Sequence, residues 1–416
     1  MVKELKHTEI GDIPVDWELQ TFDETFRVIS NNTLSRENLN NRGGAVRNIH
    51  YGDILTKFPE VLDCNEEEIP YVNELSLLSS STQLLQDGDI VVADTAEDET
   101  VGKVIEVQNL GDSKLVAGLH TIPCRVKKGD FAPGWLGYYM NSDLFHNQIL
   151  PYITGIKVSS ISKGAISETL ILVPPFDEQE KIVQSLNKIQ LLMTSETKVV
   201  NKIKLVKNGC LSKMFPQKDD TVPEMRLPGF TEAWEQRKFS DIAARESFVS
   251  TSASDVPSVE YEDVVAEEGR LNKDIRLKEA VKSGITFDGS QVLYGKLRPY
   301  LHNWLNPDFK GIAVGDWWVL KPINMEKNFL YRLIQTQQFD NIANQSSGSK
   351  MPRADWNLIS NSQFVVPFSK EEQSKIGGYF DNIDHLITLH QCKRDKYSNI
   401  KKGMMSDLLT GKIRLV

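Results

Sequence analysis

Two stretches of the chain, residues 179–214 and 373–408, carry the same spacing of hydrophobic positions. In both, apolar residues recur after alternately four and three positions, which is typical of a helix that packs along one side against another helix. The stretches align without a gap and so form an internal repeat. About 36 residues at roughly 1.5 Å each predict a helix on the order of 54 Å long for each copy. The helix seam includes Ile182, Leu186, Ile189, Glu196 and Ile203 in the first copy and Ile376, Phe380, Ile383, Ile387 and Arg394 in the second.

Two charged residues interrupt this seam and indicate how the helices pair. In a centred antiparallel pair Glu196 faces Arg394, whereas in a parallel pair Arg394 faces Val200 and has no partner. A partly buried charge without a partner is costly, so the sequence favours the antiparallel arrangement. The alternative is that both charged side chains reach water at the edge of the seam. The antiparallel arrangement also predicts that residues 409–416 pack near residues 1–17.

The repeat extends beyond the helices. A tryptophan is followed five residues later by a phenylalanine near the start of each half, as Trp17 and Phe22 and as Trp234 and Phe239. A polar stretch with prolines at 216–228 links the halves. We therefore predict a first variable domain at 1–175, a long helix at 176–215, a second variable domain at 216–368, and a second long helix with a C-terminal tail at 369–416.

Within the variable domains, short apolar runs alternate with turn residues, which predicts a mixed α+β fold. In the first domain we expect strands within 46–53, 86–93, 119–126 and 170–173, and a helix at 134–145. In the second we expect strands at 291–302, 311–320 and 364–368, and a helix at 329–339. A polar loop precedes the last strand of each domain, at 155–162 and 345–353. The two long helices are expected to pair as an antiparallel coiled coil with pseudo-twofold symmetry.

The composition is ordinary for a globular chain of 416 residues, with 40% hydrophobic and 25% charged residues. No apolar run approaches 18 residues and the start has no hydrophobic signal core, so we expect a cytoplasmic protein. The net charge of −9 argues mildly against a nucleic-acid partner, although a net acidic protein can carry a basic face. Cys64, Cys124, Cys210 and Cys392 are scattered and predict reduced thiols without a metal site.

Motifs of catalysis are missing from the sequence. It has no GxxxxGK[ST] loop for nucleotide phosphates. The tetrad 306–309, Asn-Pro-Asp-Phe, comes close to a methyltransferase motif but lacks its second proline and a preceding glycine-rich loop. We interpret it as a turn, and predict that the chain is not an enzyme.

Closely similar sequences open the two long helices: Val-Pro-Pro-Phe-Asp-Glu-Gln-Glu-Lys-Ile at 173–182 and Val-Pro-Phe-Ser-Lys-Glu-Glu-Gln-Ser-Lys-Ile at 366–376. The second has one extra residue between Pro367 and Gln373. Together with Tyr-Gly-Lys-Leu-Arg-Pro-Tyr at 294–300 and Leu-Leu-Thr-Gly-Lys-Ile-Arg at 408–414, this order of motifs resembles the DNA-specificity subunit of type I restriction-modification systems. The resemblance covers essentially the whole chain.

This resemblance implies that both variable domains are target-recognition domains, each reading one half of a bipartite site in double-stranded DNA. The helices would set the distance between the halves and dock methyltransferase subunits, two in number, with restriction or translocase subunits as further partners. No cofactor would bind this chain, since S-adenosylmethionine, and ATP and Mg in a full restriction complex, belong to partner subunits. Two alternatives are a stand-alone DNA-binding or structural coiled-coil protein and an undetected nuclease or transferase.

Reading base edges requires Arg, Lys, Asn or Gln on a presented strand or loop, whereas phosphate contacts need only positive charge and hydroxyls. The predicted strand at 291–302 offers Lys296, Arg298, Tyr300 and His302, although a solvated strand face is an equally good interpretation. The polar loops offer Lys350 and Arg353 in the second domain and Lys157 and Lys163 in the first. Weaker candidates in the first domain are Arg47, Tyr51, His120 and Arg125.

Overall fold

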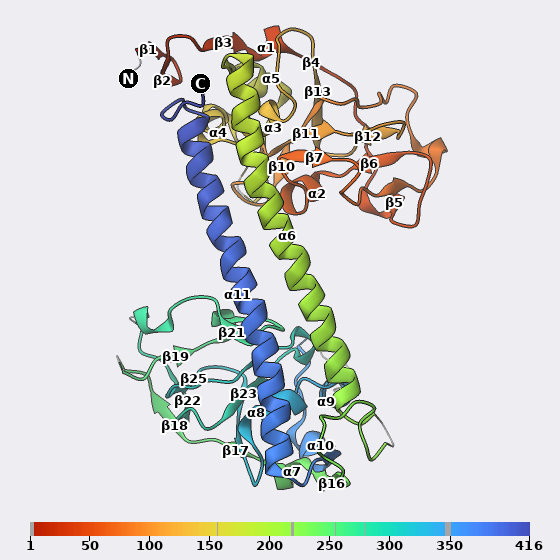
Figure 1. Cartoon of the computed structure of the whole chain (residues 1–416), viewed down its shortest axis with the longest axis vertical. Helices are drawn as coiled ribbons and strands as arrows, with labels where there is room; N and C mark the ends of the chain where they lie inside the picture. Colours follow the sequence, from red (N-terminus) through yellow and green to blue (C-terminus); the bar gives the residue numbers. More distant parts are fainter. Residues whose placement is uncertain (1–3, 156, 218–219, 254, 279, 346–350) are drawn as a thin grey trace. The chain divides into compact units, whose positions relative to one another are not determined.

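The computed structural model describes residues 4–155, 157–217, 220–253, 255–278, 280–345 and 351–416. It divides into two compact units: unit 1 comprises Met1–Ser195 and Arg394–Val416, and unit 2 comprises Glu196–Lys393. Each unit holds one mixed α+β domain, part of helix α6 (Phe176–Met214) and part of helix α11 (Lys370–Leu408) (Figure 1). The predicted α+β class is confirmed. No helix among the described residues has a stretch long and apolar enough to cross a membrane.

Two larger sheets, beside several two-stranded ones, form the domain of unit 1. The central strand, β9 (Ile90–Ala93), consists of four buried apolar residues, as expected for a strand covered on both faces. The larger sheet has the order β4 (Phe26–Val28), β13 (Thr121–Val126), β9, β11 (Val104–Gln108) and β7 (Val61–Asp63). The smaller sheet has the order β12 (Leu115–Ala117), β6 (Arg47–Ile49), β8 (Tyr71–Val72) and β5 (Leu39–Asn40).

The core of unit 1 joins distant parts of the chain. Trp17 and Trp135 pack edge to face with ring centroids 6.3 Å apart, and the same core includes Leu186 from α6 and Leu409 after α11. The remaining elements are short: β1 (Leu5–Thr8), β2 (Gly11–Pro14), β3 (Glu18–Thr21), α1 (Phe22–Thr25), α2 (Tyr51–Thr56), β10 (Thr95–Ala96), α3 (Trp135–Tyr139), α4 (Asp143–Ile149), β14 (Ser159–Ser160), α5 (Lys163–Ser167) and β15 (Leu170–Val173), which pairs with β3.

The domain of unit 2 is built on the same plan. One sheet has the order β17 (Ala243–Glu246), β26 (Trp317–Pro322), β23 (Val292–Gly295) and β24 (Trp304–Leu305). The other has the order β18 (Val249–Thr251), β22 (Ser283–Phe287), β25 (Gly311–Ala313) and β19 (Ser258–Val259). The smaller elements are β16 (Glu235–Lys238), α7 (Phe239–Ile242), β20 (Val264–Val265), β21 (Arg270–Leu271), α8 (Lys327–Leu333), α9 (Gln337–Ala343), α10 (Trp356–Asn361) and β27 (Gln363–Val366).

Several predicted elements are shorter than expected. The strand predicted at 291–302 is wrong beyond Gly295, because Arg298 and His302 have positive φ angles and the short helix η6 (Pro299–Leu301) lies between them. The strand predicted at 311–320 is two strands, β25 and β26, with a turn at Gly315 between them. The helices predicted at 134–145 and 329–339 are each a pair, α3 with α4 and α8 with α9. In both pairs the second helix starts after a capping hydroxyl, from Ser142 or Thr336.

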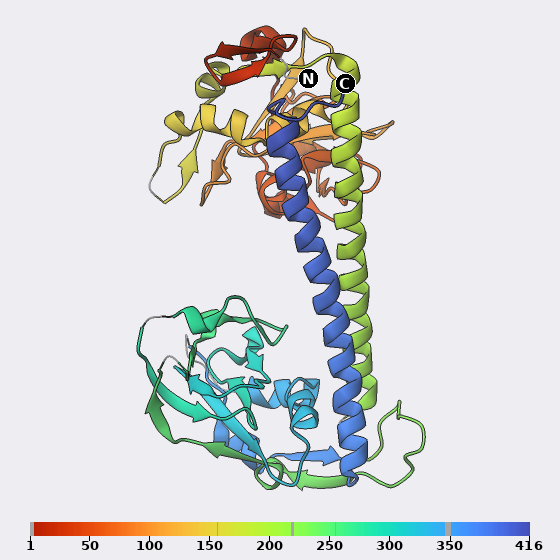
Figure 2. The same cartoon turned by 60° about the vertical axis from the view of Figure 1, so that its left-hand side comes forward.

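The halves of the long helices run antiparallel inside each unit (Figure 2). In unit 2, Lys207 Nζ lies 2.7 Å from Asp384 Oδ1, and one turn further along α6 Cys210 Sγ lies 3.3 Å from the Tyr379 hydroxyl. Positions therefore rise along α6 as they fall along α11. All the predicted seam positions are buried or half-buried.

The ion pair predicted between Glu196 and Arg394 is wrong. Glu196 Oε2 instead accepts a hydrogen bond from His390 Nδ1 at 2.5 Å, and Lys393 Nζ lies 3.4 Å from Glu196 Oε1. Arg394 pairs with its neighbour Asp395. The Glu196 side chain thus bonds about one helical turn away from the residue that centred pairing places opposite it, although the Lys207–Asp384 and Cys210–Tyr379 contacts follow that pairing within one residue.

The repeated Glu-Gln pair fastens the start of each long helix to its domain. Gln179 Nε2 donates to the carbonyl oxygen of Pro174, and Gln373 Nε2 donates to that of Pro367, both at 2.8 Å. The extra residue before Gln373 therefore leaves this contact unchanged. Each glutamine Oε1 also accepts from a domain backbone N–H, of Ala132 in unit 1 and of Glu326 in unit 2.

The glutamate of the pair joins the chain's two ends in unit 1. Trp17 Nε1 donates to Glu178 Oε2 at 3.0 Å, and Arg414 Nη2 donates to the same oxygen at 2.6 Å. Arg414 also bonds Asp16 and lies over the Trp17 ring. The prediction that residues 409–416 pack near residues 1–17 is confirmed.

Unit 2 contains the same arrangement without a chain end. Trp234 Nε1 donates to Glu372 Oε1 at 3.2 Å, and Arg226 Nη2 donates to Glu372 Oε2 at 2.8 Å. Arg226 lies in the segment that leads from α6 into the second domain. In each unit, the glutamate at the start of one long helix is therefore bonded by an arginine that follows the end of the other long helix: Arg414 after α11 in unit 1, and Arg226 after α6 in unit 2.

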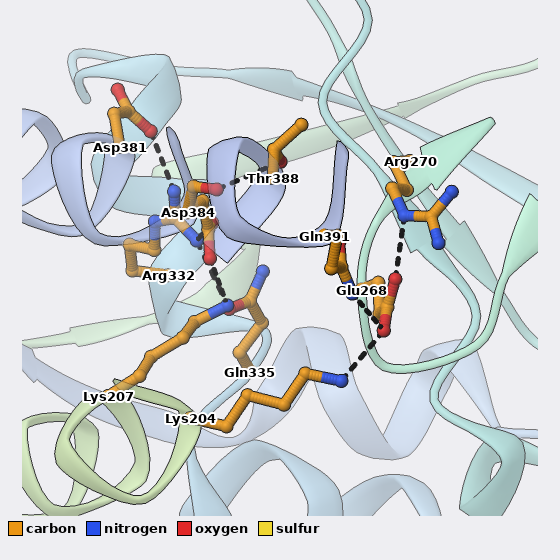
Figure 3. Close-up of polar contacts among 10 residues, drawn as sticks. All are labelled: Lys204, Lys207, Glu268, Arg270, Arg332, Gln335, Asp381, Asp384, Thr388 and Gln391. Carbon is orange, nitrogen blue, oxygen red and sulfur yellow. Dashed lines mark hydrogen bonds and ion pairs between the residues drawn. The ribbon is translucent and has the colours of Figure 1, made fainter. Parts of the chain in front are cut away.

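A polar cluster connects the domain of unit 2 to its helices (Figure 3). Arg332, only 1% exposed, donates to Asp381 Oδ1 and Asp384 Oδ2, both at 2.6 Å. Lys207 from α6 shares Asp384. Beside it, Glu268 accepts hydrogen bonds from Lys204, Arg270 and Gln391.

Unit 1 has a counterpart of this cluster with fewer charges. Lys401 donates to Glu60 at 2.5 Å and to Gln190 at 2.7 Å, and its ammonium lies over the ring of Tyr138. The Tyr138 hydroxyl donates to Asn187 Oδ1 at 2.7 Å. Asn187 and Gln190 occupy the repeat positions that the two aspartates occupy in unit 2.

Candidate nucleic-acid interface

Three segments meet at the end of strand β9 in unit 1. The backbone N–H of Asp94 donates to the carbonyl of His120 (3.1 Å), and the N–H of Ile161 donates to the carbonyl of Asp94 (2.9 Å). Thr95 pairs with Ser160 in the short sheet of β10 and β14. The polar loop predicted at 155–162 is thereby placed against the turn that precedes β13.

The same backbone frame recurs at the end of β23 in unit 2. The N–H of Lys296 donates to the carbonyl of Asp316, and the N–H of Ala354 donates to the carbonyl of Lys296, both at 2.9 Å. Leu297 forms an isolated bridge with Arg353. The frames are equivalent bond for bond, while the side chains that they carry differ.

The side chains of the unit 1 frame form a polar cluster, which we call the unit 1 edge: Tyr51, Asp94, Thr95, His120 and Ser160. His120 Nδ1 lies 3.2 Å from Thr95 Oγ1 and 3.4 Å from Asp94 Oδ1, and its ring meets that of Tyr51 edge-on at 5.2 Å. The His120 side chain is 45% exposed. The edge therefore offers an oriented imidazole with hydroxyls beside it.

The unit 2 edge consists of Tyr261, Lys296, Leu297, Asp316 and Arg353. Arg353 Nη2 donates to Asp316 Oδ2 at 3.0 Å, and Lys296 Nζ lies 3.4 Å from Asp316 Oδ1. The hydrogen bond from Arg353 holds the pKa of the Asp316 carboxyl below its usual range. Tyr261 donates to the carbonyl of Asp316 and accepts from the N–H of Leu297. Two cations and one carboxylate leave this edge with a positive charge.

Strained backbone occurs at both frames. His120 (φ 54°) in unit 1 and Arg298 (φ 48°), directly after Leu297 in unit 2, adopt left-handed conformations that non-glycine residues rarely adopt. Arg298 Nε is also buried without a hydrogen-bond partner in the part of the chain that the structure describes. Such conformations persist only where the surroundings fix them, and they gather at binding sites.

The other predicted DNA-binding residues are dispersed. Arg47 and Arg125 have internal partners, because Arg47 donates to the carbonyl of Cys64 and Arg125 is bonded to Asp89. His302 is bonded to Asp340, which turns it toward the polar cluster of the helices rather than toward the unit 2 edge. Tyr300, Lys157 and Lys163 are exposed, and Lys350 lies outside the described residues.

The sequence did not indicate Asp94, Thr95, Ser160, Tyr261 or Asp316. Their signal is the alignment of the two units. Asp94 and Lys296 each follow a buried strand, and His120 and Asp316 each precede the strand that neighbours it in the sheet. Acidic and hydroxyl side chains are not obvious DNA ligands, so a search for basic residues passes over them.

Other chemistry is sparse among the described residues. No group of His, Cys, Asp or Glu in them is arranged to hold a metal ion. All four cysteines are free, and burial raises the pKa of the Cys64 thiol to about 11 and that of Cys124 to about 12.

Comparisons with known proteins agree with this picture. Residues 14–205 match the family described as the type I restriction modification DNA specificity domain. The putative type I restriction enzyme MjaX specificity subunit of Methanocaldococcus jannaschii is 24% identical over 99% of this chain and 96% of its own length. The crystal structure of a type I restriction-modification S subunit from M. genitalium covers 98% of this chain and 99% of its own, with a TM-score of 0.56 at 12% identity. A chain from a study of type I restriction-modification complex assembly covers 96% of this chain and 99% of its own, with a TM-score of 0.54 at 13% identity.

These findings define a DNA-specificity protein built from two α+β domains and two long helices. The resemblance inferred from the repeated helices is confirmed: residues 14–205 match the type I specificity domain, and a type I specificity subunit aligns with 99% of the chain. DNA and methyltransferase subunits are the partners that such a subunit implies, and members of this family are generally not catalytic.

Proposed function

We propose that each domain of this chain reads one half of a bipartite DNA site. The observation that carries the proposal is that both units repeat the same contacts. The glutamine that fastens the long helix to its domain recurs as Gln179 and Gln373, and the backbone bonds of the frame recur at Asp94 and Lys296. Two copies of one frame with different side chains suit a protein that recognises two different sequences, because backbone geometry positions a domain while side chains read base edges.

The long helices dock the methyltransferase subunits, one on each unit. Support comes from exposed apolar residues at repeat-equivalent positions. In unit 1, Leu192 and Ile400 are exposed, each within two residues of the contact between Gln190 and Lys401. In unit 2 the equivalent residues, Leu386 and Val206, are exposed beside the contact between Asp384 and Lys207. Two equivalent apolar surfaces fit two copies of one partner.

Catalysis then belongs to the partners. The methyltransferase subunits bring S-adenosylmethionine, and restriction or translocase subunits that join the complex bring ATP and Mg. The chain itself binds none of these cofactors and works in the cytoplasm, where the DNA is. The spacing between the two half-sites is set by the length of the helices.

Reconstitution tests the proposal. The chain is purified alone and together with the methyltransferase subunit encoded beside it, and adenine methylation of a plasmid library is mapped. We expect methylation at one bipartite sequence, and only with both proteins present. Methylation or cleavage by the chain alone would instead indicate an enzyme. Tight specific binding by the chain alone, with no methylation when the partner is added, would favour a stand-alone DNA-binding protein.

Leucine variants separate docking from recognition. Leu386→Asp with Val206→Asp should reduce the number of methyltransferase subunits bound per chain from two to one, measured by mass spectrometry of the intact complex. Lys202→Asp, at an exposed position on α6 near Val206, serves as the control. Two subunits retained in the leucine and valine variant would place the docking surface elsewhere.

A further inference from the structure

We infer that the two edges are the base-reading sites of the subunit, with Arg353 contacting a guanine in one half-site and His120 contacting a base in the other. This inference rests on the proposed function and adds to it which side chains specify the sequence. It selects Arg353 and His120 from the twelve residues that the sequence offered as DNA-binding candidates, and it does not use the strand face predicted at 291–302.

The first support is that the frame presents these side chains and keeps its own backbone bonds satisfied. In both units the strand end, the turn before the next strand and the polar loop are already bonded to one another. A side chain at the frame can therefore change without disturbing the fold. Two domains that read different DNA sequences require a common frame that carries different side chains.

Arg353 has the geometry of a guanine reader. The Arg353 side chain is 51% exposed. Its Nε and Nη2 nitrogens donate to the Asp316 carboxylate, and Nη1 does not take part in this contact. A guanidinium whose direction is already fixed loses less freedom when it binds, and arginine with two hydrogen bonds to O6 and N7 is the commonest specific contact with guanine. Asp316 is thus a positioning residue for Arg353.

His120 gives the unit 1 edge a different preference. No arginine or lysine belongs to this edge, and the imidazole is oriented by Thr95, Asp94 and the ring of Tyr51. The backbone of His120 has a positive φ angle, a strained conformation that the surrounding contacts hold in place. The two edges therefore differ in charge and in donor pattern, and they should specify different bases.

The test is methylation mapping of the reconstituted complex on a library randomised at both half-sites. Arg353→Ala should reduce the preference for guanine at one position of one half-site by roughly 5- to 150-fold, with the other half-site unchanged. His120→Ala should relax one position in the other half-site only. Asp316→Asn should relax the same position as Arg353→Ala but less completely, because the arginine remains and loses only its orientation.

A matched control is Lys310→Ala. Lys310 is an exposed cation of unit 2 that is paired with one aspartate, Asp255, as Arg353 is with Asp316, but it lies outside the frame. This variant should keep the wild-type site. If Arg353→Ala slowed methylation of all sequences equally, the residue would contact a phosphate and the inference would be overturned. Unchanged specificity in both edge variants would overturn it as well, whereas a wild-type complex that methylates no specific site would contradict the proposed function itself.

Discussion

Arg414 Nη2 lies 2.6 Å from Glu178 Oε2, so the last residues of the chain are bonded to the first turn of the first long helix. Both side chains are almost fully buried. The bonds raise the pKa of the Arg414 guanidinium, which keeps it charged. The C-terminal tail is therefore a structural part of unit 1.

Arg414→Ala should destabilise unit 1 by about 3–5 kcal/mol, because it leaves the buried Glu178 carboxylate without its main partner. Thermal unfolding of the purified chain measures the effect. Arg414→Lys keeps the charge and should cost less. Arg226→Ala should have a similar effect on unit 2, where Glu372 takes the place of Glu178. An alanine variant at Arg414 as stable as the wild type would mean that the tail is dispensable.

Glu196 should be energetically coupled to His390 and not to Arg394. A double-mutant cycle of Glu196→Gln with His390→Gln should be non-additive, because the two side chains share a hydrogen bond. The same cycle with Arg394→Gln serves as the control and should be additive. Coupling to Arg394 in unfolding experiments would restore the ion pair that the sequence predicts.

The same contact makes stability depend on pH. The hydrogen bond from His390 lowers the pKa of Glu196 below its ordinary value of 4.5. The folded state therefore favours ionised Glu196, which stabilises the fold above about pH 4.5 and loses this effect as the pH falls through the lowered pKa. The Tm difference between wild type and Glu196→Gln should shrink below pH 4.5. In a His390→Gln background that shrinkage should be smaller.

The two polar clusters suggest that each domain is matched to its own helices. Arg332 and Tyr138 occupy equivalent places, and each bonds the helix residue at the equivalent repeat position, Asp381 or Asn187. Arg332→Tyr alone should destabilise unit 2 by about 3–5 kcal/mol, since it removes a buried guanidinium that pairs with both Asp381 and Asp384. Adding Asp381→Asn recreates the pair seen in unit 1 and should recover part of the loss. Equal thermal stability of the single and double variants would argue against this matching.

Much of the fold could be predicted because it depends on repeated local signals. The long helices follow from periodic apolar residues, and β9 follows from a buried run after a turn. Arg298 shows the limit, because the basic and aromatic alternation of 294–302 resembles a strand. Its left-handed backbone is imposed by bonding to Pro352, more than fifty residues away. The partner of Glu196 was missed because the apolar spacing predicts which helix positions face each other but not which polar side chain within reach will bond a charge.

The candidate site was less accessible to sequence reasoning. Lys296 and Arg353 were candidates because of their charge, and His120 was a weaker candidate within the strand expected at 119–126. Arg47 has the same chemistry as Arg353, yet it is buried and bonded to Cys64. Only three-dimensional structure distinguishes an arginine that is used inside a domain from one that is presented at its edge. Asp316 acts through its neighbour, which a single sequence cannot indicate.

The last prediction concerns helix length as the determinant of half-site spacing. Each long helix has 39 residues, about 58 Å at 1.5 Å per residue. Seven residues added after Thr197 and seven added after Gln391 keep the apolar seam in phase and lengthen each helix by about 10 Å. At about 3.4 Å per base pair, the preferred spacer should grow by about three base pairs with both half-site sequences unchanged. Adding one residue to one helix turns everything beyond it by about 100° and should abolish assembly instead. Methylation mapping distinguishes these outcomes, and a heptad variant with the wild-type spacer would show that something other than the helices sets the distance.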